Sequence, residues 1–116
     1  VYEAGSRYAA GGFHDIPGEE AFAEVRAFEP ETGQLRWAFP LQGRTFAGLL
    51  STAGGLVFGS SAEGDIFALN SSDGTPLWNF RTGGRMYSNP MSYSVDGKQH
   101  VAVAAGHALY VFALTE

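Results

Sequence analysis

Short runs of apolar residues, many of them β-branched or aromatic, make up most of the chain, and glycine interrupts them about every 8–12 residues. Apolar and polar positions tend to alternate within these runs, which is typical of strands joined by tight turns. No stretch combines a helical period with capping residues, so no helix is expected. The sequence therefore predicts an all-β fold. Its strands are expected at residues 23–28, 35–39, 48–51, 56–60, 65–69, 77–80, 91–95, 100–105 and 108–114.

An internal repeat organises these strands. Residues 27–39, AFEPETGQLRWAF, align with residues 68–80, ALNSSDGTPLWNF, at an offset of 41 positions. The identical positions hold a small residue, a turn glycine and two aromatic residues, namely Ala27 and Ala68, Gly33 and Gly74, Trp37 and Trp78, and Phe39 and Phe80. A period of about 40–45 residues is typical of the four-stranded blades of a β-propeller, and the β-rich content argues against a helical array of similar period.

The repeat divides the chain into parts of three blades. We expect the outer strands of one blade at about residues 20–40, a full blade at about 46–82 and three strands of the last blade at about 86–116. The fold class is then a partial β-propeller of about two and a half four-stranded antiparallel blades. Because repeat units cannot bury their apolar faces alone, the isolated chain is expected to be poorly soluble or to self-associate. The missing fourth strand would come from elsewhere, most simply from an N-terminal segment.

Each tryptophan follows a tight turn and begins the outermost strand of its predicted blade. A flat ring at this position can cover the backbone of the turn in the neighbouring blade and bury about 200 Å². The glycine supplies a positive φ, an Asp or Asn before it can accept backbone hydrogen bonds, and the alanine leaves room for a ring. We therefore interpret Trp37 and Trp78 as contacts between blades rather than as surfaces for a substrate.

Composition narrows the class of protein. The chain has 116 residues, a formal net charge of −5, 45% hydrophobic residues and no cysteine, which describes one ordered domain without disulfides or thiolate metal sites. The acidic balance argues against nucleic acid and anionic membranes as partners. The longest apolar run, residues 101–114, is shorter than the roughly 20 residues that cross a bilayer. The chain starts at Val1 rather than Met, which indicates a processed chain or a fragment.

Three segments resemble the alcohol dehydrogenases that depend on pyrroloquinoline quinone (PQQ). The pattern Ala-x-x-x-x-Thr-Gly-x-x-x-Trp at Ala27–Trp37 resembles the tryptophan-docking motif of that family. Residues 45–58, TFAGLLSTAGGLVF, look like its WAG…STAGGLVF segment, and residues 96–106, DGKQHVAVAAG, resemble its DGKQYVAVAAG segment. The resemblance extends over about residues 5–116 and is nearest to the methanol and ethanol dehydrogenases of the family.

The resemblance implies a periplasmic eight-bladed propeller that oxidises primary alcohols to aldehydes. Such an enzyme holds PQQ and calcium, or a lanthanide, on its axis and passes electrons to a c-type cytochrome. This chain would be its C-terminal portion, inactive alone and partnered by the remainder of the propeller, with no membrane span and no nucleic acid. The catalytic aspartate and the metal ligands of the family lie in earlier blades, so no catalytic or metal-binding residue is assigned here.

The resemblance also places three residues at the cofactor. In the family, the segment before STAGG contributes a Trp side chain and backbone N–H groups to the quinone pocket, and it maps onto Phe46, Ala47 and Gly48. Phe46 keeps apolar cover but lacks the indole donor. The N–H groups of Ala47 and Gly48 would meet a quinone carboxylate, since glycine permits close approach. The alternative is a plain turn that lines the propeller axis.

Two other functions remain open. Propellers with the same tryptophan turn also serve as non-catalytic outer-membrane assembly lipoproteins, and a solute-binding or lectin-like propeller is a third possibility, because fold does not fix function. The STAGGLVF and DGKQ segments favour the enzyme, since blade stacking alone does not require them. His14, His100 and His107 lack metal-ligand spacing, and His14 beside Asp15 is expected in a loop. Tyr2, Tyr8 and Phe13 are candidates for a loop over the propeller mouth.

Overall fold

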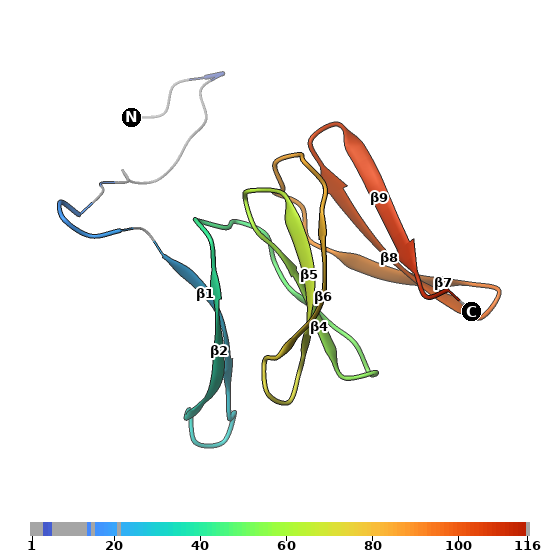
Figure 1. The fold of residues 1–116 in the computed structure, drawn as a ribbon, viewed down its shortest axis with the longest axis horizontal. Helices are drawn as coiled ribbons and strands as arrows, with labels where there is room; N and C mark the ends of the chain where they lie inside the picture. Colours follow the sequence, from blue (N-terminus) through green and yellow to red (C-terminus); the bar gives the residue numbers. More distant parts are fainter. Residues whose placement is uncertain (1–3, 6–13, 15, 21, 116) are drawn as a thin grey trace.

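The regular structure of the described residues consists of nine strands. The computed structural model describes residues 4–5, 14, 16–20 and 22–115, and within them it contains strands and no helix (Figure 1). The strands are β1 (Ala23–Phe28), β2 (Leu35–Leu41), β3 (Leu50–Ser51), β4 (Leu56–Ser60), β5 (Asp65–Asn70), β6 (Pro76–Arg81), β7 (Met91–Val95), β8 (Lys98–Ala105) and β9 (Ala108–Ala113). The predicted strands are confirmed, and their ends agree with the prediction to within two residues. Asp15 and the aromatic residues of the predicted mouth loop lie outside the described residues.

The strands form three antiparallel sheets in simple sequential order. The sheets are β1-β2, β3-β4-β5-β6 and β7-β8-β9. They lie side by side in the order of the sequence (Figure 1). Short turns connect consecutive strands within each sheet. The turn between β7 and β8 has positive φ at both central residues, 51° at Asp96 and 77° at Gly97, as an Asp-Gly type I′ hairpin requires.

The sequence repeat is a repeat in space. Ala27 pairs with Trp37 across β1 and β2, and Ala68 pairs with Trp78 across β5 and β6. In both hairpins the register shifts immediately after this pair. Each turn glycine has a positive φ, 70° in the first hairpin and 74° in the second. The two aligned 13-residue segments therefore build the same kind of bulged hairpin.

The apolar core lies between the sheets and forms two clusters. The cluster between the first and second sheets contains Val25, Phe67 and Leu69, with Trp37, Phe39, Leu41 and Val57 packed against it. The cluster between the second and third sheets contains Ile66, Met86, Val103 and Ala105, with Tyr110 and Phe112 packed against it. Strand β5 supplies residues to both clusters, so it is buried on both faces. This is the burial expected where sheets stack on each other.

The indole of Trp37 joins the first sheet to a turn of the second. Its Nε1 donates a hydrogen bond to the carbonyl oxygen of Ser71 at 2.9 Å. Its ring lies over the same turn, so closely that a Cβ atom at Gly74 would be 2.6 Å from Cε3 of Trp37. The interpretation of Trp37 as a contact between sheets is therefore confirmed. The room for the ring comes from Gly74, whereas Ala68 lies opposite Trp78 in its own sheet.

The turn that receives Trp37 is held by its own side chains. Asn70 Oδ1 accepts a hydrogen bond from the Ser72 N–H at 2.9 Å, and Asp73 Oδ1 accepts one from the Thr75 N–H at 2.9 Å. The backbone closes the turn, because the Gly74 N–H donates to the Asn70 carbonyl at 2.8 Å. The predicted acceptor role of Asp or Asn before the glycine is confirmed in this turn.

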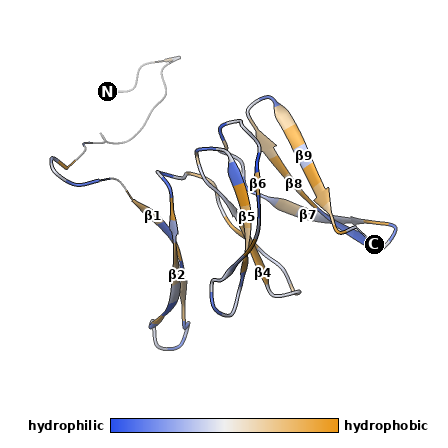
Figure 2. Ribbon diagram, in the orientation of Figure 1, coloured by the Kyte–Doolittle hydropathy of each residue, from blue (hydrophilic) through white to orange (hydrophobic). Residues whose placement is uncertain are grey.

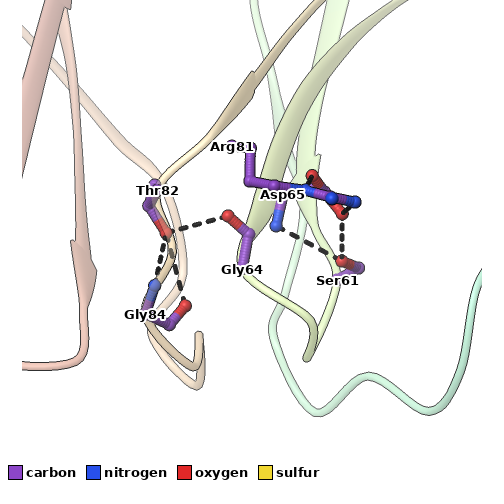
Figure 3. Close-up of polar contacts among 6 residues, drawn as sticks. All are labelled: Ser61, Gly64, Asp65, Arg81, Thr82 and Gly84. Atoms are coloured by element: carbon purple, nitrogen blue, oxygen red, sulfur yellow. Dashed lines mark hydrogen bonds and ion pairs between the residues drawn. The ribbon is translucent and has the colours of Figure 1, made fainter.

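A close approach of backbone also joins the second and third sheets. The Thr82 hydroxyl donates to the carbonyl oxygen of Gly64 at 2.8 Å (Figure 3). The Thr82 N–H donates to the same oxygen, also at 2.8 Å. A Cβ atom at Gly64 would lie 2.5 Å from the Gly84 oxygen, and one at Gly84 would lie 2.9 Å from the Ala105 carbonyl carbon. The hydroxyl of Tyr110 donates to the Thr82 carbonyl at 3.0 Å. The connection between β6 and β7 is thus packed between turns of both sheets.

Substitution of the two turn glycines tests the Trp37 contact. Alanine at Gly74 or at Gly33 must adopt the same left-handed backbone conformation. A Cβ atom at Gly74 would collide with the Trp37 ring, whereas no atom lies within 4 Å of a Cβ atom at Gly33. We expect Gly74→Ala to lower the free energy of unfolding of the full-length protein by about 1–3 kcal/mol more than Gly33→Ala, the usual cost of overpacking. Urea unfolding measures the difference. Equal effects would contradict the contact, and a Trp37→Ala background should remove the difference.

Acid titration tests the turn itself. The backbone N–H of Thr75, and after it the Thr75 side chain, bind the carboxylate and lower the pKa of Asp73. A lowered folded-state pKa stabilises the fold above the unfolded pKa of about 3.9, and this contribution disappears as the pH falls through the folded value. We expect Asp73→Asn to reduce stability at pH 6 and to have less effect at pH 2–3. Carbon NMR titration of the Asp73 carboxyl should give a midpoint below the ordinary value, and an ordinary midpoint would refute this account.

Candidate functional site

Two equivalent loops lead into the first strands of the second and third sheets. Residues 45–49 precede β3 and residues 86–90 precede β7, at the same offset of 41 positions that relates the two tryptophans. This offset makes Phe46 equivalent to Tyr87. The loop before β3 contains the residues that the sequence assigns to the cofactor, so both loops form the candidate site.

Hydrogen bonds within the chain hold the loop before β3. The Thr45 hydroxyl donates to the Ser60 carbonyl at 2.9 Å, and the Ala47 N–H donates to the Thr45 hydroxyl at 3.3 Å. The Gly48 N–H donates to Oδ1 of Asn89 at 2.5 Å, which connects this loop to the next one. Both backbone donors that the sequence assigns to a quinone carboxylate therefore have acceptors inside the chain.

The loop before β7 is held equally well. The hydroxyl of Ser88 donates to the Ala104 carbonyl at 2.8 Å and accepts from the Ala104 N–H at 2.9 Å. The Met86 side chain is fully buried in the cluster between the second and third sheets. Asn89 completes the connection to Gly48. The two loops thus form one continuous hydrogen-bonded surface across two sheets.

The structure explains why residue 48 is a glycine, and the explanation differs from the one that the sequence suggested. A Cβ atom at this position would lie 2.8 Å from Oδ1 and 3.0 Å from Cγ of Asn89. The sequence explained this glycine by the close approach of a ligand, whereas the neighbour in the structure is the Asn89 amide. Asn89 itself was missed, and its only signal in the sequence is its equivalence to Gly48 in the repeat.

Two aromatic side chains project from these loops. The Phe46 side chain is 68% exposed and the Tyr87 side chain is 58% exposed. Their ring centroids lie 6.5 Å apart with 32° between the ring planes. We call them the Phe46–Tyr87 pair. The sequence predicted Phe46 as cofactor cover and missed Tyr87, although the offset of 41 residues would have located it.

Charged groups elsewhere make local contacts. Arg81 Nε donates to Asp65 Oδ1 at 3.0 Å across β5 and β6, and this bond raises the pKa of Arg81 (Figure 3). The Arg81 side chain is 72% exposed, so solvent screens the pair and its contribution to stability is small. The His100 ring stacks on Tyr93 at 5.1 Å and its Nδ1 lies 3.0 Å from the Lys98 carbonyl oxygen.

In the part of the chain that the structure describes, no group of three or more His, Asp or Glu side chains is arranged to hold a metal ion. The same part contains no helix long and apolar enough to cross a membrane. The Phe46–Tyr87 pair and the loops that carry it form the candidate site.

A family model of PQQ repeats, described as outer membrane protein assembly factor BamB, matches residues 21–115. The chain belongs to the PQQ-repeat family. Among proteins with such repeats, quinoprotein ethanol dehydrogenase of Pseudomonas putida is 35% identical over 107 residues, which cover 91% of this chain and 17% of that protein. Lanthanide-dependent methanol dehydrogenase of Methylorubrum extorquens is 37% identical over 101 residues, 87% of this chain and 16% of that protein. The chain spans less than a fifth of the length of these relatives.

A solved structure supports the same conclusion for the fold. Quinohemoprotein alcohol dehydrogenase from Comamonas testosteroni matches with a TM-score of 0.72 and 31% identity over 80% of this chain and 14% of that chain. The antiparallel sheets of this PQQ-repeat chain are therefore part of a β-propeller. The predicted fold class is confirmed.

The candidate site fits one part of a PQQ-like cofactor. Exposed aromatic faces from two adjoining sheets suit a flat ring system. The carboxylates of such a cofactor would find the N–H groups of Ala47 and Gly48 already bonded to Thr45 and Asn89. The residues therefore fit the ring of such a cofactor, whereas its carboxylates would need hydrogen-bond donors from elsewhere.

A double-mutant cycle tests the connection between the two loops. Gly48→Ala brings a methyl group against Asn89 and should lower the free energy of unfolding by about 1–3 kcal/mol. Asn89→Ala removes the neighbour, so Gly48→Ala should cost much less in that background. Gly54→Ala is the control, because the nearest atom to a Cβ there is Thr52 Oγ1 at 3.8 Å. Additive effects of the two substitutions would show that Gly48 and Asn89 are not in contact.

Proposed function

We propose that this sequence is the C-terminal portion of a PQQ-dependent alcohol dehydrogenase that oxidises primary alcohols to aldehydes. The observation that carries the proposal is its 35% identity to quinoprotein ethanol dehydrogenase over 91% of the chain. The exposed Phe46–Tyr87 pair supports it, because two adjoining sheets present aromatic surface at equivalent positions. The substrate would be a small alcohol and the electron acceptor a c-type cytochrome, with the whole enzyme in the periplasm.

The three sheets would be consecutive blades of the propeller. Strands β1 and β2 would be the outer strands of one blade (about residues 20–40), β3–β6 a full blade (about 46–82) and β7–β9 three strands of the last (about 86–116). Packing supports the assignment. The Phe39 ring of β2 lies 5.5 Å from Phe67 of β5, and the Phe80 ring of β6 lies 5.2 Å from Phe112 of β9.

Exposed apolar surface on the third sheet supports a closed propeller in the whole enzyme. Met91, Ala102 and Val111 lie opposite one another on β7, β8 and β9 and share a face. Met91 is 56% and Val111 46% exposed, and β9 is among the most hydrophobic strands (Figure 2). Trp78 is 39% exposed. A fourth strand, most simply from an N-terminal segment, would pair with β9 and complete the last blade.

The chain would contribute a wall of the cofactor pocket. When bound, PQQ supplies the acceptor for the electrons and the hydrogen that leave the alcohol. The Phe46–Tyr87 pair would cover its ring and exclude water from one side. Thr45, Ser88 and Asn89 would keep these two side chains in place through the hydrogen bonds described above. The catalytic base and the ligands of calcium or a lanthanide would lie outside this sequence.

A non-catalytic scaffold is the second candidate. The matching family model is described as an outer membrane assembly factor, and the intrachain bonds of Ala47 and Gly48 suit a structural loop. Such a scaffold would conserve the sheet packing and have no use for an exposed Phe46–Tyr87 pair.

Reconstitution of the full-length protein separates the two candidates. With PQQ and calcium or lanthanum added, we expect ethanol-dependent reduction of an artificial electron acceptor. Phe46→Ala should weaken PQQ binding about 2- to 10-fold through loss of an aromatic contact. Phe28→Ala is the control, because Phe28 is 54% exposed on β1 and lies outside the two loops. Gly48→Val is a poor test, since it would also disturb Asn89. A folded, metal-loaded protein that neither binds PQQ nor oxidises alcohols would support the scaffold.

A further inference from the structure

Among the exposed aromatic residues that the structure describes, Phe46 and Tyr87 pair with each other alone, whereas Phe22 and Phe28, 74% and 54% exposed, have no ring contact. Trp78 and Phe80 are also part-exposed, but their rings pack against Phe112 at 4.9 and 5.2 Å. The Tyr93 ring stacks on His100. Among the described residues, Phe46 and Tyr87 have a ring contact only with each other, at 6.5 Å. Two large, mostly exposed rings from neighbouring sheets therefore lie beside each other, and no other ring of the described residues packs against them.

The backbone that carries these rings is fixed on both sides. Thr45 is bonded to Ser60, Ser88 is bonded to Ala104, and the Gly48 to Asn89 bond joins the loops to each other. Loops tied in this way limit how far the rings can turn inward to bury themselves. Fixed loops with exposed rings form a preorganised surface, which lowers the entropy cost of binding a rigid ligand.

We infer that Tyr87 is a second ligand-binding residue of this site, and that the Phe46–Tyr87 pair binds a flat quinone ring with a carbonyl acceptor at its edge. The identity of the ring rests on the proposed function. The two ring faces supply apolar cover, and the phenolic hydroxyl of Tyr87 donates a hydrogen bond to the carbonyl. Among the described residues, no hydrogen bond from the Tyr87 hydroxyl competes with this role.

Substitutions that separate the ring of Tyr87 from its hydroxyl test the inference. Full-length wild-type protein, Tyr87→Phe and Tyr87→Ala are titrated with PQQ, and binding is followed by quenching of intrinsic fluorescence rather than by turnover. Loss of one hydrogen bond in Tyr87→Phe should weaken binding about 2- to 10-fold. Loss of the ring as well should weaken it about 10-fold or more in Tyr87→Ala. Tyr93→Phe is the matched control, because Tyr93 is 37% exposed in β7 of the same sheet, and its affinity should match the wild type.

The outcomes distinguish this inference from the proposed function. If wild-type protein binds PQQ and both Tyr87 variants bind within twofold of it, the inference is wrong and the proposed function stands. If folded, metal-loaded wild-type protein binds no PQQ, the proposed function fails and this inference fails with it. Circular dichroism and thermal unfolding show whether each variant folds. Tyr87→Phe keeps the ring and its packing, so it decides the matter should Tyr87→Ala not fold.

Discussion

The fold depends on the contact between the Trp37 indole and the turn before β6. That single side chain makes a hydrogen bond to Ser71 and lies over Gly74, so it links the outer strand of one sheet to the outer hairpin of the next. A sheet with one free face cannot bury enough apolar surface to be stable alone. The contact sets the spacing of the sheets, and the aromatic pairs behind it, such as Phe39 with Phe67, fill the space between them.

The opposite end of the second sheet makes a different kind of contact, with the third sheet. Where the tryptophan places a large ring over a glycine, the connection between β6 and β7 brings backbone against backbone at Gly64, Gly84 and Ala105. Side chains at Gly64 and Gly84 would collide with this backbone, so the glycines allow the turns to approach closely. Together these contacts hold the three sheets side by side, as seen in Figure 1.

The candidate site is a consequence of this stacking. Equivalent loops in consecutive repeats lie beside each other, so residues at equivalent positions of two repeats become neighbours in space. Phe46 and Tyr87 are such a pair, and Gly48 and Asn89 are another. The first pair is exposed, and the second ties the loops together. Exposed aromatic residues and residues that connect the loops therefore alternate along the same short segment.

The strands, the Asp96-Gly97 hairpin and the docking of Trp37 were predictable from the sequence, because periodicity and turn chemistry act over a few residues and the repeat exposes the rest. The partner of the Gly48 N–H and the pairing of Phe46 with Tyr87 were not, although the repeat made those positions equivalent. Equivalence in a repeat does not say which equivalent atoms touch. Only the distance and rotation between stacked sheets decide that, and these are set by side-chain packing across the whole interface.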